Sequence, residues 1–359
     1  MGFPFFSKRN LGIDVGTSAI KIVELSSFGK KIKLENYLEI PTFPFHQRES
    51  HLKEKSIIFL PAEDIADAIK IGLSQAKIST KNCIFAIPDF LTFFTIFTLP
   101  PMSKEELEPA IKMEARKYIP VPLKEVTLDW QIIKKESLVP EQGVTVLVVA
   151  IPTEILYKYQ KIATLSNLKL IALEAEVFGL IAPFLLKETK ETVVIIDLGI
   201  KSTTCSIIEG GILKDYHSLN FSSNFITERL TWELGIPWNL AEKVKRVWGI
   251  SNSSIKNEKL KEIYEKMLIS IFNPLFEELE RIFKNFSLKE EKEISKIVLG
   301  GGTCLMPGLL KAFEERFQKP IQIINPFEDI IVPEEVKEIL KEKGPSFAIA
   351  TGMAIKGLI

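Results

Sequence analysis

The sequence has very little cysteine and histidine. Three residues of each type occur in 359, and the cysteines, Cys83, Cys205 and Cys304, lie far apart along the chain. Their spacing fits neither a zinc cluster nor a redox-active pair, and scattered thiols are typical of a reducing cytoplasm. We therefore expect these cysteines to be buried residues without a chemical role.

Net charge and long hydrophobic runs are also missing. Lys plus Arg and Asp plus Glu number 46 each, so the formal net charge is zero. A chain without excess positive charge is poorly suited to binding nucleic acid or an anionic membrane through broad electrostatics. The apolar start is too short for a signal peptide, and no stretch is long enough to cross a bilayer. We expect a cytoplasmic protein that does not bind nucleic acid.

One pattern, by contrast, occurs twice. Residues 11–25 read as a strand ending in Asp-x-Gly at Asp14, a turn of small residues, and a second strand running back. Residues 193–208 repeat this order around Asp197, which is 197 − 14 = 183 positions later. This distance is far beyond the period of a solenoid, so the repeat predicts two similar halves that face each other.

The rest of the chain alternates helical and strand patterns, with one interruption. From Asp89 a strand, a helix and two more strands form a separate segment. Ser103 and Glu106 predict a capping box at the start of its helix, and the Ile-Pro-Val-Pro run from Ile119 ends that helix. Residues 224–286 read as helical throughout. The alternating order elsewhere is typical of an α/β fold.

The two Asp-x-Gly turns have the chemistry of a phosphate and metal site. Glycine lets the backbone approach a ligand, hydroxyl residues add donors, and successive turn amides can bind an anion. Asp14 and Asp197 could each approach a hydrated Mg²⁺ from one side. Either turn alone is equally well explained as a plain hairpin, because Asp-x-Gly is common in turns. Together they favour a ligand held between two halves.

Two further motifs fit such a ligand. The triplet Gly300–Gly302 follows a strand and precedes a helix, so a flat ring or a phosphate could lie against bare backbone. Glu242 and Lys245 lie three positions apart on one face of a predicted helix. A lone glycine triplet is weak support, and the charged pair by itself would be a solvated helix face.

The order of these four motifs resembles the actin-like ATPase superfamily, which implies a two-lobed, ribonuclease H-like α/β fold. The position of the segment from Asp89 resembles the small inserted subdomain of FtsA. The run Glu114–Asp129, in which a helix leads into Ile-Pro-Val-Pro, and the run Gly344–Ala348 resemble the PilM family, FtsA-like cytoplasmic components of type IV pilus machines.

The resemblance implies a division of the chain into four parts. The first lobe core would comprise residues 1–88, 146–190 and 345–359, and residues 89–145 would be the inserted subdomain. The second lobe core would comprise residues 191–223 and 294–344, with residues 224–293 as a helical subdomain.

The resemblance also implies ATP and Mg²⁺ as ligands. Asp14 and Asp197 would bind Mg²⁺ through water. The first turn would contact phosphates through Gly16, Thr17, Ser18 and Lys21, the second through Gly199, Ser202 and Thr203, and the nucleoside would meet Glu242, Lys245, Gly301, Gly302 and Thr303. The residue that orients the attacking water in relatives best matches Glu174, with Glu176 as the alternative if the register is off by two.

The second turn departs from its relatives. Many of them have Gly-Gly where this chain has Ile200-Lys201, and FtsA-like turns carry an acid where it has Thr204. A bulky pair should restrict backbone approach to the terminal phosphate. Lys201 could add charge there, although a plain exposed lysine is the simpler interpretation. We therefore expect slow or absent hydrolysis and a nucleotide-bound scaffold.

The expected partner is the N-terminal cytoplasmic segment of PilN, a membrane-anchored pilus protein, which would also bring the chain to the inner membrane and indirectly to other pilus components. The segment would lie in a groove between the first lobe and the inserted subdomain, with Leu91–Leu99 and Ile119–Val121 as candidate walls. Self-association is a further possibility. The alternative function is a phosphotransferase of the sugar-kinase or acetate-kinase type, which needs a general base for which the sequence has no distinct signal.

Overall fold

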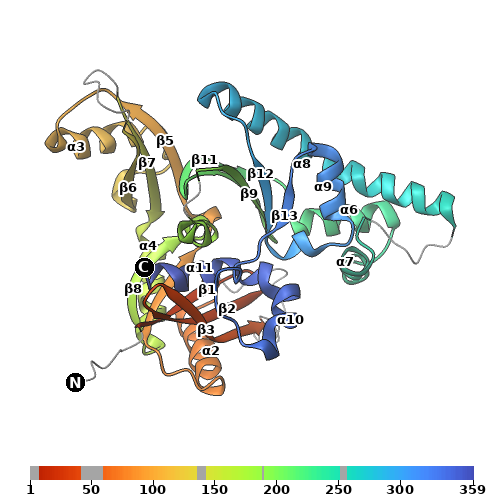
Figure 1. Cartoon of the computed structure of the whole chain (residues 1–359), viewed down its shortest axis with the longest axis horizontal. Helices are drawn as coiled ribbons and strands as arrows, with labels where there is room; N and C mark the ends of the chain where they lie inside the picture. The colour runs from red at the N-terminus through yellow and green to blue at the C-terminus, as the bar shows by residue number, and fades with distance from the viewer. Residues whose placement is uncertain (1–7, 42–59, 136–142, 188–189, 251–256) are drawn as a thin grey trace.

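Two five-stranded sheets and one three-stranded sheet form the framework of the protein (Figure 1). The computed structural model describes residues 8–41, 60–135, 143–187, 190–250 and 257–359. The strand orders are β3-β2-β1-β4-β8, β11-β10-β9-β12-β13 and β5-β7-β6. In each large sheet, three antiparallel strands are followed by two parallel ones. The repeated Asp-x-Gly hairpin occupies the same place in both, as the sequence predicts.

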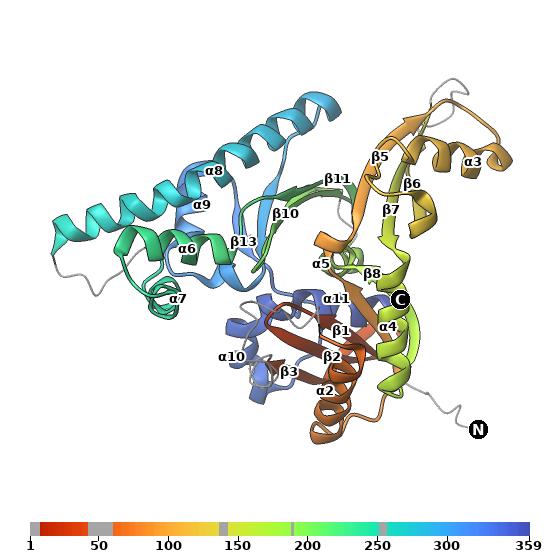
Figure 2. The same ribbon diagram turned by 180° about the vertical axis from the view of Figure 1, so that it is seen from behind.

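The first large sheet is covered by helices on both faces. Its strands are β1 (Lys8–Val15), β2 (Ala19–Phe28), β3 (Lys31–Pro41), β4 (Asn82–Ile87) and β8 (Lys169–Ala175). Helices α2 (Ala62–Gln75) and α4 (Thr153–Leu165) lie side by side on one face (Figure 2), and α11 (Ala348–Lys356) packs on the other. Because neighbouring residues of a strand face opposite sides, Leu11 and Ile13 of β1 point toward α2 and α4, while Asp14 does not.

The second large sheet carries the helical part of the chain. Its strands are β9 (Thr192–Leu198), β10 (Thr203–Glu209), β11 (Ile212–Leu219), β12 (Lys296–Gly300) and β13 (Ile321–Ile323). Helices α6 (Ser223–Leu234), α7 (Trp238–Val247), α8 (Glu258–Glu290) and α9 (Leu309–Phe317) share one apolar core with it. Even α8, at 33 residues, is amphipathic, and along the described chain no helix has the length and apolar character that a membrane span requires.

The three-stranded sheet consists of β5 (Phe93–Leu99), β6 (Val126–Lys135) and β7 (Val144–Pro152), so its last strand extends beyond residue 145. Helix α3 (Lys104–Ala115) packs on one face, and its capping box is confirmed by reciprocal hydrogen bonds between Ser103 and Glu106. The opposite face packs against β11, where the rings of Phe94 and Tyr216 lie 4.2 Å apart. Both faces of β5 are therefore covered.

Short 3₁₀ helices connect several of these elements. They are η2 (Asp89–Leu91), η3 (Leu123–Glu125), η4 (Ala182–Leu186), η5 (Gly302–Leu305) and η6 (Gly344–Phe347).

The chain returns to the first large sheet earlier than the sequence suggested. We expected residues 294–344 to continue the second lobe, but the part that follows β13, including α10 (Glu334–Lys343), packs on β2 and β3. Ile331 exchanges two backbone hydrogen bonds of 2.9 Å with the edge strand β3, and Phe327 and Leu340 enter the same core. An amphipathic helix could cover either sheet, so its periodicity alone did not show which one.

Glycines allow α11 to contact its neighbours through the backbone. A Cβ atom on Gly352 would lie 1.8 Å from the carbonyl oxygen of Gly179, which belongs to α5 (Glu176–Ile181). A Cβ atom on Gly12 of β1 would lie 1.8 Å from the carbonyl oxygen of Ala350. Because the obstructing atoms are backbone, no change of rotamer could relieve either overlap. These contacts set the distance between the first sheet, α11 and α5.

We predict that Gly352→Ala lowers the free energy of unfolding by about 3 kcal/mol or more, because the added methyl group would overlap the backbone of α5. Gly302→Ala is the matched control, since a Cβ atom there would meet nothing within 4 Å. Chemical denaturation of both variants checks the prediction, and equal stability of the two would contradict it.

Candidate functional site

A cavity of about 580 Å³ lies between the two large sheets, where the turns of the repeated hairpins face each other. Its walls come from the turns after β1 and β9, the end of β12, the start of α5, helix α7 and the segment before α11. The volume is in the range of pockets that hold a small molecule or cofactor. The fold therefore brings the repeated turns to one site.

The two turns have the same backbone geometry. The amide of Gly16 donates to the carbonyl of Ala19 over 3.1 Å, and the amide of Gly199 donates to the carbonyl of Ser202 over 3.0 Å. The second turn is also held from behind by α6, whose first amide, at Ser223, donates to the carbonyl of Gly199 over 2.9 Å. Each turn therefore presents a fixed tip to the cavity.

Asp14 and Asp197 both line the cavity, and they lie close enough for the charge of Asp14 to act on Asp197. Both carboxyl groups are buried, and the Oδ1 atom of each has no hydrogen-bond partner among the described residues. Burial raises the pKa of Asp14, although Lys21, directly opposite on β2, lowers it in part. Burial and the charge of Asp14 raise the pKa of Asp197 to about 6. Two desolvated carboxylates, each with an unpartnered Oδ1 atom in the described structure, are ligands that suit a hydrated divalent cation.

Two more acidic residues, Asp89 and Glu176, are joined to each other through backbone amides beside this pair. The amide of Asp89 donates to Glu176 Oε2, and the amide of Val177 donates to Asp89 Oδ1, each over 3.2 Å. Burial raises the pKa of Glu176 well above its usual range, and it raises that of Asp89 to about 7 with help from the charge of Asp197. Asp89 was not among the candidates from the sequence. It follows β4, which runs parallel to β1, so it lies at the same edge of the sheet as Asp14.

The structure separates the two candidates for orienting a water. Glu174, the preferred one, does not line the cavity, and its Oε2 atom lies 3.0 Å from Lys356 Nζ on α11. Glu176, the alternative, lines the cavity. The reason is that β8 ends at Ala175, so Glu176 is the first residue of α5 and turns toward the carboxylates.

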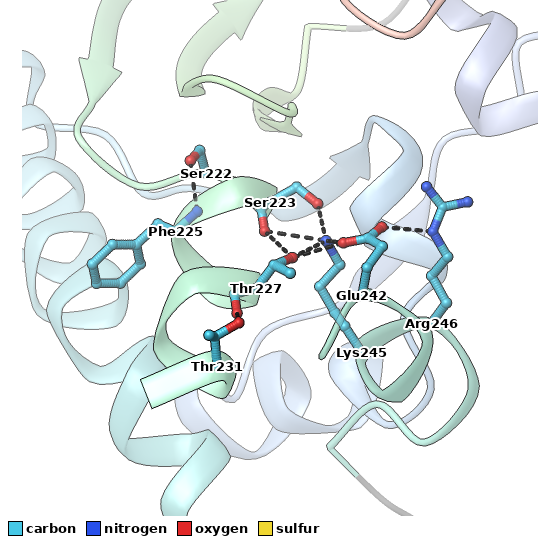
Figure 3. Close-up of polar contacts among 8 residues, drawn as sticks. All are labelled: Ser222, Ser223, Phe225, Thr227, Thr231, Glu242, Lys245 and Arg246. Carbon is cyan, nitrogen blue, oxygen red and sulfur yellow. Dashed lines mark hydrogen bonds and ion pairs between the residues drawn. The ribbon is translucent and has the colours of Figure 1, made fainter. Parts of the chain in front are cut away.

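The Glu242–Lys245 pair forms part of a polar network between α6 and α7 (Figure 3). Lys245 Nζ lies 2.6 Å from Glu242 Oε2 and donates to Ser223 Oγ over 2.6 Å and to Thr227 Oγ1 over 2.8 Å. Burial lowers the pKa of Lys245, which is 5% exposed. Arg246, the outermost member, donates to Glu242 over 2.6 Å. Lys245 thus fixes the two helices, while Glu242 and Arg246 stand at the cavity wall.

The glycine triplet lies directly over Asp197. Gly301 has φ of +77°, and a Cβ atom there would be 2.7 Å from Asp197 Oδ1 and 2.6 Å from the carbonyl of Leu198. Only glycine fits this position without strain. The backbone can therefore approach both the carboxylate and a ligand beside it.

Most of the residues selected from the sequence meet in this cavity. Those that line it are Asp14, Gly16, Thr17, Ser18, Lys21, Asp197, Gly199, Ser202, Glu242, Lys245, Gly301, Gly302 and Thr303. Thr203 does not, because its side chain is fully buried on the other face of β10. Thr204, directly opposite Asp197 on the neighbouring strand, lines the cavity instead, and its buried Oγ1 has no partner among the described residues.

The family described as "Type IV pilus assembly protein PilM" matches residues 12–358. The chain belongs to the PilM family. A similar solved structure is a "PilM-PilN type IV pilus biogenesis complex", with 25% identity, 98% of each chain covered and a TM-score of 0.80.

More distant structures share the fold alone. The ethanolamine utilization protein EutJ from Carboxydothermus hydrogenoformans is 13% identical, with 98% of this chain and 91% of that chain covered and a TM-score of 0.52. MreB5 of Spiroplasma citri bound to AMPPNP is also 13% identical, with 96% and 94% covered and a TM-score of 0.52. The actin-like two-lobed fold expected from the sequence is confirmed.

We predict that Asp89→Asn changes how the stability of this PilM-family protein depends on pH. The pKa of Asp89 is about 7 when folded, against an ordinary value of 3.8, so the folded wild type binds the extra proton between these values. Relative to Asp89→Asn, the wild type should lose about 1.4 kcal/mol per pH unit as the pH rises from about 4 to about 7, and nothing further above that.

Denaturation of both proteins across this pH range measures the difference. Asp67→Asn, at an exposed position on α2, provides the control. A difference between the wild type and Asp89→Asn that stays constant with pH would contradict the prediction.

Proposed function

We propose that this PilM-family protein binds ATP with Mg²⁺ in the cavity and acts as a scaffold in type IV pilus assembly. The single observation that carries the nucleotide proposal is the pair of buried Oδ1 atoms on Asp14 and Asp197, which lack hydrogen-bond partners in the described chain. They stand at the bases of two facing turns whose tips carry amides, hydroxyls and a lysine. A divalent cation there would neutralise phosphate charge and would be held by both lobes.

The remaining polar groups of the cavity form two sets, one placed for the phosphates and one for the nucleoside. In the proposal, Gly16, Thr17, Ser18 and Lys21 contact phosphates from the first turn, and Gly199, Ser202 and Thr204 contact them from the second. Thr204 replaces Thr203 because only Thr204 lines the cavity. The nucleoside lies between Glu242 with Arg246 on α7 and the bare backbone of Gly301 and Gly302.

The proposal assigns at most slow turnover to the nucleotide. Glu176 is the acidic side chain at the position expected for orienting a water, and burial raises its pKa, which disfavours its ionised form. A protonated carboxyl group is a poor acceptor of a proton from water or from a substrate hydroxyl. The same reasoning applies to the alternative function, a phosphotransferase, which would need an ionised general base beside its substrate.

The proposed partner is the N-terminal cytoplasmic segment of PilN, because the similar solved structure is a complex of PilM with PilN. Through this partner the protein would lie at the inner membrane. We also propose that residues 89–145 with the rest of β7 form an inserted subdomain, and that residues 224–293 form the helical subdomain of the second lobe.

Several residues expected to line the PilN groove are buried in a core. We expected Leu91–Leu99 and Ile119–Val121 as walls, but Phe97, Leu99 and Ile119 belong to the core between the three-stranded sheet and α3. A hollow on the first lobe, lined by α2 and the start of α4 directly after β7, remains open and includes Tyr157, which is 65% exposed. We propose this hollow as the part of the groove that the first lobe contributes.

We predict that saturating Mg-ATP raises the melting temperature of the wild type, since a ligand at about 100 times its Kd stabilises the native state by about 2.7 kcal/mol. Asp14→Asn and Lys21→Ala should each abolish most of this shift. Lys112→Ala, at an exposed position on α3, is the control and should keep the full shift. Undiminished shifts in both site variants would rule out the proposed site.

We predict that an immobilised peptide with the N-terminal cytoplasmic sequence of PilN captures the wild type and that Tyr157→Ala weakens this capture. The matched control is Tyr118→Ala. Tyr118 is 51% exposed, but it lines a separate hollow between the inserted subdomain and the second lobe. If Tyr118→Ala loses capture and Tyr157→Ala retains it, the peptide binds in the hollow that Tyr118 lines and the proposed groove is wrong. Repeating the assay without Mg-ATP tests whether nucleotide matters.

A further inference from the structure

The tip of the second turn carries a charged side chain where the first turn carries a hydroxyl. Because both turns close by a hydrogen bond between the glycine amide and the carbonyl three residues on, Lys201 corresponds to Ser18. Both residues line the cavity. Lys201 is exposed, and its turn is fixed from behind by amides of Ser223 and Asn224 on α6. The backbone of the tip is therefore held by α6, and the lysine side chain extends from this fixed tip at the cavity lining.

Across the cavity, Lys201 lies over an aromatic ring from the other lobe. Its Nζ atom is 5.7 Å from the centroid of Phe90, within the range of a cation–π contact. Phe90 belongs to η2, between β4 and the three-stranded sheet, and is 37% exposed. This contact joins the second phosphate turn to the entrance of the inserted subdomain.

Phe90 itself is held in place by its neighbour. Asp89 is 4% exposed and is tied to the start of α5 by the two hydrogen bonds to Val177 and Glu176. The backbone that carries the ring is therefore held at the start of α5. A competing anion in the cavity would draw away Lys201 and leave Phe90 where it is.

We propose that Lys201 is the residue by which this cavity distinguishes ATP from ADP, and that it exchanges the Phe90 ring for the terminal phosphate. The inference rests on the proposed nucleotide site and adds a specificity determinant to it. A terminal phosphate placed between the tips of the two turns would be within reach of a lysine side chain. A charge-assisted hydrogen bond to phosphate is stronger than a cation–π contact at an exposed position, so the exchange favours ATP. ADP lacks the group that Lys201 would bind.

The test measures Kd for Mg-ATP and Mg-ADP by calorimetry in the wild type, Lys201→Ala, Lys201→Arg and Phe90→Leu. Lys201→Ala should weaken ATP binding about tenfold and leave ADP binding unchanged, since one hydrogen bond to a charged group is lost. Lys201→Arg should retain most of the discrimination, because it keeps the positive charge. Phe90→Leu should strengthen ATP binding severalfold, because the competing ring is removed.

Lys284→Ala, on the exposed face of α8, removes the same charge from the same lobe outside the cavity and should change neither Kd. An unchanged ratio of the two Kd values in Lys201→Ala, in a protein that binds both nucleotides, overturns the inference and leaves the nucleotide site standing. Unchanged ATP affinity in Phe90→Leu overturns the exchange. A wild type that binds neither nucleotide removes the proposed function, and the inference with it.

Discussion

The arrangement of the lobes depends on a backbone contact between two short helices. Gly352 of α11 meets Gly179 of α5, and Gly12 of β1 meets α11 on its other side, at distances that exclude any side chain. Helix α5 in turn contributes Val177, Leu180 and Ile181 to the core that contains β9 and β12 of the second sheet. Because α5 is shared in this way, the separation of the two Asp-x-Gly turns follows from how closely α11 can approach it.

The same helix explains the electrostatics of the cavity. Its first residue, Glu176, is positioned by α5 beside Asp89, while Asp14 and Asp197 arrive from the ends of β1 and β9. Burial raises the pKa values of all four carboxyl groups, and repulsion by neighbouring carboxylates adds to this for Asp89, Glu176 and Asp197. Packing of the apolar cores holds them together against this repulsion. Such a cavity favours a cation, and the Oδ1 atoms of Asp14 and Asp197 have no hydrogen-bond partner among the described residues.

Features set by short-range sequence patterns could be predicted from the sequence. Features set by contacts between residues far apart in the chain could not. The repeated hairpin and the capping box at Ser103 are short-range patterns, and the structure confirms both. The sequence resemblance pointed to Thr203 as a phosphate-contacting residue, but Thr204 lines the cavity. The reason is the antiparallel register, which pairs Thr204 with Asp197. Asp89 contacts Glu176 and Val177 of α5, which follow it in the chain by 87 and 88 positions, so no local sequence pattern reveals the contact.

The three-stranded sheet packs on the second large sheet and is joined to the first by η2, which connects the two proposed sites. It packs on β11 through Phe94 and Tyr216, and Lys214 donates to the carbonyl of Ile133 over 3.0 Å. Burial and the charges of Asp89 and Glu176 raise the pKa of Tyr216, which places this contact within the field of the cavity carboxylates. The chain enters the sheet through η2, whose residues Asp89 and Phe90 face those carboxylates and Lys201. A movement of η2 at the cavity would therefore act on the start of β5, where the three-stranded sheet begins.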